Sequence, residues 1–181
     1  MVYEPREDSY LLLSHVKQYA KGRVLDMGCG SGILGIEASK YAREVVCADI
    51  DEFASVVFRK NSGGIRNVKF VCSDLFSDIQ GKFDLIVINP PYLPEDVEED
   101  DASRLATTGG KVGYEFIEQF LDDAKNYLKK DGKILMCFSS LSYKDKIDDI
   151  LVRTNYKFEK IDEKKLFYEE LYIYLIYVQQ C

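Results

Sequence analysis

The stretch RVLDMGCGSG, residues 23–32, decides the fold. It begins as a short apolar strand over Arg23–Met27 and continues into a loop in which Gly28, Gly30 and Gly32 alternate with single residues. Glycines after a strand and before a helix let the backbone pass close to a bound ligand. The spacing of apolar residues predicts that helix over Ile33–Tyr41.

Strands and helices alternate on both sides of this unit. Further strands are expected at Glu44–Ala48, Val68–Cys72, Phe83–Ile88, Lys133–Phe138, Tyr156–Ile161 and Leu171–Val178. Helices are expected at 6–20, at Glu52–Lys60, along the apolar face from Phe116 to Leu128, and around Ile147–Leu151, with a turn at Asp131-Gly132. Alternation with short connections predicts a mostly parallel sheet covered on both faces, and the last two strands predict an antiparallel hairpin at one edge. We therefore predict one doubly wound α/β domain over residues 1–181, with ligands at the carboxyl ends of its strands.

The composition limits the classes of function. The chain has 181 residues, 46% hydrophobic and 30% charged, which is typical of a globular domain with its own core. Its 24 basic and 31 acidic residues give a net charge of −7, which argues against a protein that binds nucleic acid without a partner. It has no apolar run of 18 residues and no apolar signal sequence, so we expect a cytoplasmic protein without membrane spans.

Cysteine and histidine patterns argue against a metal site. The five cysteines, which form no Cys-x-x-Cys pair, are Cys29, Cys47, Cys72, Cys137 and Cys181. We interpret them as buried free thiols. His15, the only histidine, is expected to be a partly buried surface residue of the first helix. Without a Gly-x-Ser-x-Gly motif, a Ser-His-Asp hydrolase is not indicated.

The glycine loop and three acidic residues indicate the ligand. Ile33 stands where a dinucleotide fingerprint needs its third glycine, and no Gly-Lys-Ser/Thr follows, so neither NAD nor a nucleoside triphosphate fits. Asp26 would repel a pyrophosphate and attract an ammonium group. Asp49, 23 positions later, could accept hydrogen bonds from ribose hydroxyls, and Asp74 from an adenine amine. S-adenosylmethionine, which a methyl transfer converts to S-adenosylhomocysteine, carries an ammonium group, ribose hydroxyls and an adenine amine. The alternative is that these aspartates are ordinary residues of strand ends and helix caps, where aspartate is common.

The fourth predicted strand ends in Asn89-Pro90-Pro91-Tyr92. The prolines make this turn stiff. The side-chain carbonyl of Asn89 and the backbone carbonyl of Pro90 could accept both hydrogens of a planar NH₂ group, against which Tyr92 could stack. Two acceptors would orient the weakly nucleophilic nitrogen toward a methyl donor. The alternative is an ordinary rigid turn.

These motifs resemble the class I S-adenosylmethionine-dependent methyltransferases of the HemK type, which modify the glutamine of the Gly-Gly-Gln motif in translation release factors. VYEPREDS (residues 2–9) and GGKVG (residues 109–113) are similar to the short archaeal and eukaryotic branch. The resemblance implies a seven-stranded sheet and, in some members, a small zinc-binding activator protein. It implies that Asn89 touches cofactor and substrate, and it implies cofactor contacts at Ser9, Asp26, Gly28, Asp49 and Asp74, with Gly30 in the same glycine loop.

Two other functions remain open. Asn-Pro-Pro-Tyr suits any planar NH₂, so a DNA or RNA amino-methyltransferase acting on adenine N6, cytosine N4 or guanine N2 is the first. A non-catalytic S-adenosylmethionine-binding subunit is the second. Six carboxylates within residues 95–101 open a long loop that is either a solvated surface or a lid selecting a basic protein partner. The aromatic-rich segment Tyr168–Tyr177 is interpreted as sheet core and edge rather than as a base-stacking surface.

Overall fold

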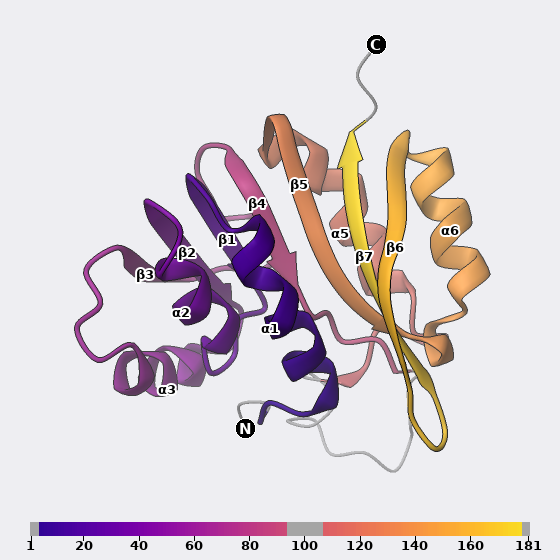
Figure 1. The fold of residues 1–181 in the computed structure, drawn as a ribbon, viewed down its shortest axis with the longest axis horizontal. Coiled ribbons are helices and arrows are strands. Elements are labelled where there is room, and N and C mark those ends of the chain that lie inside the picture. Colours follow the sequence, from indigo (N-terminus) through magenta and orange to yellow (C-terminus); the bar gives the residue numbers. More distant parts are fainter. Residues whose placement is uncertain (1–3, 94–106, 179–181) are drawn as a thin grey trace.

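A computed structural model describes residues 4–93 and 107–178. The strands form one seven-stranded sheet in the order β3-β2-β1-β4-β5-β7-β6 (Figure 1). They are β1 (Arg23–Met27), β2 (Glu44–Asp49), β3 (Val68–Cys72), β4 (Phe83–Ile88), β5 (Leu128–Ser139), β6 (Tyr156–Lys165) and β7 (Glu170–Val178). The helices are α1 (Glu7–Tyr19), α2 (Ile33–Ser39), α3 (Glu52–Ser62), α5 (Glu115–Ala124) and α6 (Lys144–Arg153), with short 3₁₀ turns at Lys125–Tyr127 and Ser140–Ser142.

The strand pairing confirms the predicted doubly wound sheet. Strands β1 to β5 are parallel, whereas β7 is antiparallel to both β5 and β6. The chain leaves β1 toward β2 on one side and later enters β4 on the other side of β1. At such a reversal of strand order the loops diverge and leave a crevice beyond the strand ends. The fold therefore places a cleft between the loops that follow β1 and β4.

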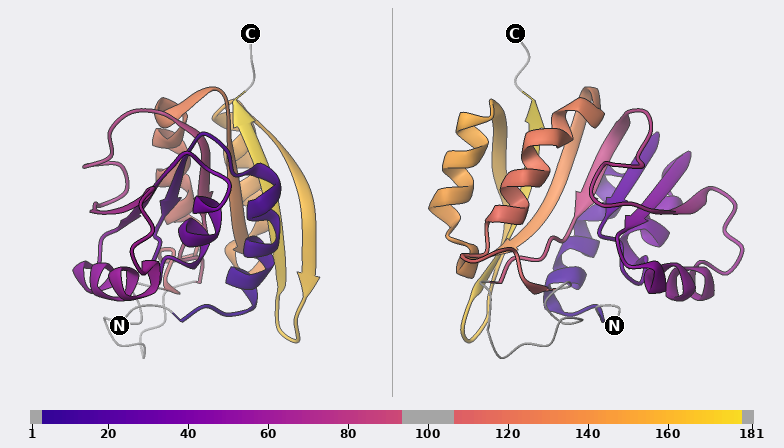
Figure 2. Two further views of the ribbon diagram at one scale, coloured as in Figure 1. Left: turned by 60° about the vertical axis from the view of Figure 1, so that its left-hand side comes forward. Right: turned by 180° about the vertical axis from the view of Figure 1, so that it is seen from behind.

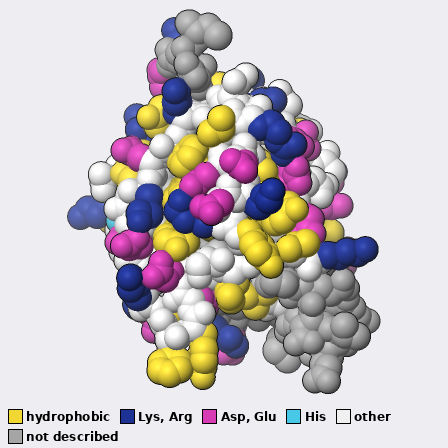
Figure 3. All heavy atoms as spheres, turned by 90° about the vertical axis from the view of Figure 1, so that its right-hand side faces the viewer, with side chains coloured by type: hydrophobic (Ala, Val, Ile, Leu, Met, Phe, Trp, Pro, Cys, Tyr) yellow, Lys and Arg dark blue, Asp and Glu magenta, His cyan; other side chains and the backbone are white. Residues whose placement is uncertain are grey.

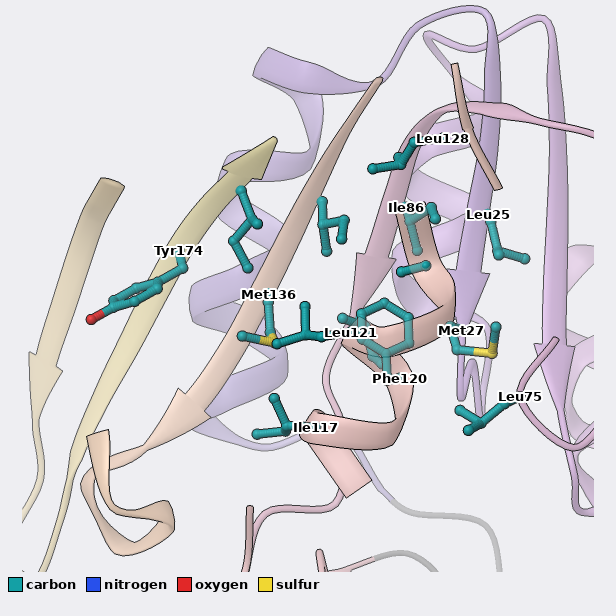
Figure 4. Close-up of a cluster of buried hydrophobic side chains, with 14 of the residues drawn as sticks. Leu25, Met27, Leu75, Ile86, Ile117, Phe120, Leu121, Leu128, Met136 and Tyr174 are labelled. Atoms are coloured by element: carbon teal, nitrogen blue, oxygen red, sulfur yellow. The ribbon is translucent and has the colours of Figure 1, made fainter. Parts of the chain in front are cut away.

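Helices cover both faces of the sheet (Figure 2). On one face, a buried core joins helix residues to strand residues. The helix residues include Leu12 of α1, Leu34 of α2 and Phe58 of α3. On the other face, α5 and α6 pack their apolar sides against the sheet, and Figure 4 shows Ile117 and Phe120 of α5 among the sheet side chains. Because β1 side chains alternate between faces, Leu25 and Met27 join the second core, while Val24 and Asp26 face α1 and α2.

Several sequence expectations need correction. The predicted turn at Asp131-Gly132 lies inside β5, where the pairing register with β4 shifts between Phe83 and Leu85. Strand β6 runs to Lys165, four residues beyond the predicted end, because an edge strand can be charged where a central one cannot. The thiol of Cys72 is exposed, whereas those of Cys29, Cys47 and Cys137 are buried and free as predicted.

Other expectations are confirmed or lie outside the described residues. His15 is partly buried on α1 as predicted, and its Nε2 contacts Asp162 Oδ2 at 2.8 Å. The acidic loop 95–101 and Cys181 lie outside the described residues. Within 4–93 and 107–178, the helices are too short or too polar to cross a bilayer.

Candidate active site at the carboxyl edge of the sheet

A cleft of about 900 Å³ opens where the fold predicts it. Its walls come from the start of α1, the loops after β1, β2, β3 and β4, the segment around residues 107–111, and the turn between β6 and β7. Among the described residues, six acidic side chains line it, against two basic ones. The acidic residues are Glu7, Asp8, Asp49, Asp51, Asp74 and Glu169, and the basic ones are Arg6 and Lys111. The cleft therefore disfavours phosphate groups and favours cationic or neutral hydrogen-bond donors.

The glycine loop forms one wall of the cleft. Gly28 has φ of +67°, and a Cβ added there would meet no atom within 4 Å. A side chain at this position would be strained and would occupy the cleft, so glycine keeps space for a ligand against the backbone. The Cys29 N–H donates to the Ala48 carbonyl at 2.9 Å, which ties the loop to β2.

Asp49, the last residue of β2, is fixed by the loops on both sides of it. Its Oδ2 accepts from the Gly30 N–H at 2.7 Å, and its Oδ1 accepts from the Asp51 N–H at 2.9 Å. Burial raises the pKa of the Asp49 carboxyl, although these backbone donors oppose the shift. Each carboxylate oxygen has a second lone-pair direction, so this group can still accept from a ligand hydroxyl.

Asp26 behaves differently from the other predicted cofactor residues. Its carboxylate points toward α2, where Oδ2 accepts from the Gly35 N–H at 2.8 Å. The residue is 1% exposed and does not line the cleft. Its Oδ1 is buried without a hydrogen-bond partner among the described residues. Burial raises the pKa of Asp26 to about 7.

A second polar network joins α1 to the Asn-Pro-Pro-Tyr turn. Asp8 Oδ2 accepts from Asn89 Nδ2 at 3.0 Å and from the Tyr92 hydroxyl at 3.1 Å, while Asp8 Oδ1 accepts from the Ser9 N–H at 2.6 Å. Ser9 Oγ lies 3.4 Å from the same Asn89 nitrogen. A carboxylate can only accept hydrogen bonds, so Asp8 faces the side-chain nitrogen of Asn89. Asn89 Oδ1 therefore points away from Asp8. That oxygen is buried and has no donor within the described parts of the chain.

The rim beside this network is stiff. Tyr92 and Leu93 both donate their N–H to the Thr107 carbonyl, and Gly109 donates to the Leu93 carbonyl at 2.8 Å. A Cβ on Gly109 would lie 2.7 Å from the Pro91 carbonyl oxygen, so only glycine fits this close approach. Ser142 Oγ adds a bond to the Tyr92 carbonyl at 2.9 Å. The turn after β4 is therefore held by the segment 107–109, by Ser142 and, through Asp8, by α1.

The structure brings most of the predicted site residues together. Those that line the cleft are Ser9, Gly28, Gly30, Asp49, Asp74, Asn89, Pro90 and Tyr92. Asp74 lies two residues beyond the end of β3 and is exposed. Asp8 was not expected in the site, yet it is 3% exposed and contacts both Asn89 and Tyr92. The signal available was an acidic residue next to Ser9 in the first turn of a helix, a position where the helix dipole favours a negative charge.

With this geometry in place, comparison with known proteins decides the family. The family model described as the methyltransferase small domain matches residues 6–168. The chain belongs to that family. Methyltransferases of this family use S-adenosylmethionine, and the open backbone at Gly28 together with the acceptor at Asp49 fits such a ligand. The fold and the catalytic class predicted from the sequence are thereby confirmed.

The relatives of this methyltransferase modify proteins or ribosomal RNA. A Methanocaldococcus jannaschii protein, provisionally named protein N5-glutamine methyltransferase, is 38% identical over 95% of this chain and 89% of its own length. The ribosomal RNA small subunit methyltransferase C of Actinobacillus succinogenes is 32% identical over 80% of this chain but only 42% of its own length. The release factor glutamine methyltransferase of Borreliella burgdorferi is 32% identical over 73% of this chain and 51% of its own length.

A solved structure resembles this methyltransferase over its whole length. It is the E. cuniculi Mtq2–Trm112 complex responsible for methylation of the translation termination factor eRF1. The TM-score is 0.79 at 25% identity, over 98% of this chain and 99% of that chain. The fold of this chain is thus shared with a complex responsible for methylation of a translation termination factor.

Proposed function

We propose that this methyltransferase transfers a methyl group from S-adenosylmethionine to the side-chain amide of the glutamine in the Gly-Gly-Gln motif of a translation release factor. The observation that carries the proposal is the buried network in which Asp8 fixes Asn89 and leaves its carbonyl oxygen without a donor. A buried carbonyl without a donor is unfavourable, and an amide N–H of the substrate would satisfy it. The relatives named for glutamine methylation support the same substrate.

The cofactor half of the cleft provides three contacts in this proposal. Gly28 and Gly30 let the backbone approach the ligand, Asp49 accepts from ribose hydroxyls, and Asp74 accepts from the adenine amine. Asp26 acts indirectly, because it holds the start of α2 behind the glycine loop rather than facing the cleft. When bound, S-adenosylmethionine supplies a methyl group that its sulfonium centre already activates.

The acceptor half orients a poor nucleophile. Asn89 Oδ1 and the Pro90 carbonyl accept the two N–H bonds of the glutamine amide, and the ring of Tyr92 borders the planar group. Held in this way, the amide nitrogen presents its lone pair toward the cofactor half, which removes much of the orientational entropy from the barrier. In the net balance one N–H bond of the amide is replaced by N–CH₃, the S–CH₃ bond of the sulfonium is broken with its electron pair left on the sulfur of S-adenosylhomocysteine, and one proton leaves to solvent.

The charge of the cleft favours a protein substrate over nucleic acid. Six carboxylates line it, and a phosphate backbone would have to approach them. The ribosomal RNA methyltransferase relative has more than half of its length outside the region it shares with this chain. An RNA or DNA amino-methyltransferase therefore remains the second candidate, favoured only by the generality of the Asn-Pro-Pro-Tyr turn.

A partner subunit, the location and the domain extent are part of the proposal. Mtq2 forms a complex with Trm112, so we propose that a small, zinc-binding activator protein assembles with this chain as well. An enzyme that modifies a translation factor acts where translation takes place, so we propose a cytoplasmic location. We also propose that residues 1–181 form one catalytic domain.

The test is label transfer from methyl-labelled S-adenosylmethionine, with and without the activator, to a release factor or to ribosomal RNA. We expect label on the factor and, by mass spectrometry, a 14 Da increase on the Gly-Gly-Gln peptide, the mass of a methylene group. Asn89→Ala should lower the rate by about 10²-fold or more while retaining most cofactor binding, as expected when a group that stabilises the transition state is removed. Label on RNA alone would reject the proposal in favour of the second candidate. Label on neither, with the activator present, would leave a non-catalytic binding subunit.

A further inference from the structure

The turn between β6 and β7 carries an exposed aromatic pair. Phe167 and Tyr168 are 89% and 86% exposed, more than any other large hydrophobic side chain in the described residues. Their rings meet edge to face with centroids 4.6 Å apart. The Leu166 N–H donates to the Glu169 carbonyl at 2.8 Å and closes the turn beneath them. Tyr168 was expected in the sheet but lies in this turn, and of the tyrosines from Tyr168 to Tyr177 only Tyr172 and Tyr174 are buried.

The hairpin extends from the sheet at the edge where the cleft opens (Figure 1). Seen from the side of β6 and α6, hydrophobic side chains gather at the lower end of the molecule, where this hairpin ends (Figure 3). Its base is anchored, because β7 pairs with β5 and the Glu170 N–H donates to Ser140 Oγ at 3.0 Å. An aromatic pair on an anchored turn loses little conformational entropy when it binds, which makes it a good contact surface.

The same turn also reaches into the cleft. Leu166, Glu169 and Leu171 line the cleft that contains Asn89. Glu169 Oε2 is buried without a hydrogen-bond partner among the described residues. A buried carboxylate oxygen without a donor is costly, so a donor from a bound ligand would stabilise it.

The charges around the tip favour a protein over a nucleic acid. Lys164 pairs with Glu7, and Lys165 pairs with Glu170 at 3.3 Å, so the lysines next to the aromatic pair are already neutralised. The charged residues that line the cleft beside them are mainly acidic. Binding of a nucleic acid strand needs cations for its phosphates as well as aromatic rings for its bases. An aromatic pair beside acidic groups suits an apolar and N–H-rich protein surface.

We propose that the β6–β7 turn is a docking element for the protein substrate, in which Phe167 and Tyr168 pack on the release factor beside its target loop. Glu169 Oε2 accepts a hydrogen bond from an N–H group of that loop as it enters the cleft. This inference rests on the proposed function and names a contact outside the reacting groups. Docking at this turn makes an intact release factor a better substrate than a short peptide that binds only in the cleft.

The test compares two substrates in one assay, an intact release factor and a short peptide containing Gly-Gly-Gln. For the double variant Phe167→Ser, Tyr168→Ser we expect KM for the intact factor to rise about tenfold, the scale of losing an aromatic anchor, with kcat within twofold. The peptide should lose several times less in kcat/KM. For Glu169→Gln we expect kcat/KM to fall for both substrates, because that side chain lies in the cleft.

Val152→Ser is the matched control. Val152 is 66% exposed and lies in the last turn of α6, which leads away from the carboxyl edge of the sheet. It should leave both substrates unchanged, and thermal unfolding should report folded protein for every variant. An unchanged KM for the intact factor, or an equal loss with the peptide, overturns the docking role while leaving the proposed function intact. Label on RNA that depends on Phe167 and Tyr168 replaces it with nucleic acid docking. No wild-type turnover of either substrate rejects both proposals.

Discussion

At the scale of single residues, Asp8 matters because of what it does to Asn89. A free asparagine amide has two orientations of similar energy that differ by exchange of nitrogen and oxygen. The Asp8 carboxylate 3.0 Å from Nδ2 removes one of them, because two acceptors would otherwise face each other. Asp8 is therefore a positioning residue for the candidate acceptor, and Tyr92 shares the same oxygen.

Asp8→Ala should lower kcat by about 10²-fold, the typical effect of misplacing a reacting group by an ångström. Cofactor affinity should change by less than threefold, because the glycine loop and Asp49 are untouched. Steady-state kinetics and calorimetric titration with S-adenosylhomocysteine check the two parts. Gln18→Ala, on the exposed side of α1 and outside the lining of the cleft, is the control. A variant in which affinity falls as far as kcat would show that Asp8 shapes the cofactor site instead.

Asp26 provides a pH prediction. Burial raises its folded-state pKa to about 7, above the ordinary value near 4 of an unfolded chain. The folded state then keeps a proton that the unfolded state releases, so this contribution to stability is complete below about pH 4 and is lost as pH rises through about 7. Asp26→Asn removes the titration. The pH dependence of the unfolding free energy should therefore differ between the two proteins by up to one proton between about pH 4 and 7. Parallel curves from denaturant titrations would contradict the assignment.

At the scale of elements, the central strands were predictable and the edges were not. β1, β2 and β4 are buried on both faces, so each has a mostly apolar sequence that is recognisable as a central strand. β6 mixes charges with apolar residues because one edge faces water, and only its first half has a recognisable pattern. The irregular start of β5 depends on its register with β4, which is a long-range property.

The candidate site divides in the same way. The positions of residues at the end of a strand or directly after it, such as Gly28, Asp49 and Asn89, were predictable because parallel strands end at one edge. Asp26 was assigned to the cleft by its nearness to the loop, but the alternation of side chains along β1 directs it to the α2 face. Asp8 and Glu169 come from elements more than 75 residues from Asn89 in sequence, and no local pattern joins them.

Helix α1, which carries Asp8 and Ser9, is tied to β6 by the contact between His15 and Asp162. The hydrogen bond from His15 lowers the pKa of the Asp162 carboxyl. A lowered folded-state pKa gives stability that is present above the unfolded value and lost as pH falls through the folded value. Asp162→Asn should lower Tm by about 1–3 °C at pH 7, since exposed ion pairs contribute at most about 1 kcal/mol. The difference should vanish below the acidic range where Asp162 titrates. Scanning calorimetry at both pH values checks this, and a difference that persists in acid would contradict it.

At the scale of the whole molecule, net charge and site charge have the same sign. The chain carries −7, and the cleft is lined by more carboxylates than cations. Such a field attracts basic surfaces and is screened by salt over about 10 Å at 0.1 M. The electrostatic field affects how the partner approaches and not the methyl transfer itself. We therefore expect it to change KM and not kcat.

We therefore predict that KM for an intact release factor rises severalfold between about 50 and 300 mM salt while kcat stays constant. Neutralising the six acidic residues of 95–101 to their amides changes the net charge from −7 to −1 and should remove much of this salt dependence. The short Gly-Gly-Gln peptide, with little charge of its own, is the control and should respond weakly to salt in both proteins. If the neutralised protein keeps the affinity and salt response of the wild type, the acidic segment is a solvated surface and the attraction comes from the cleft alone.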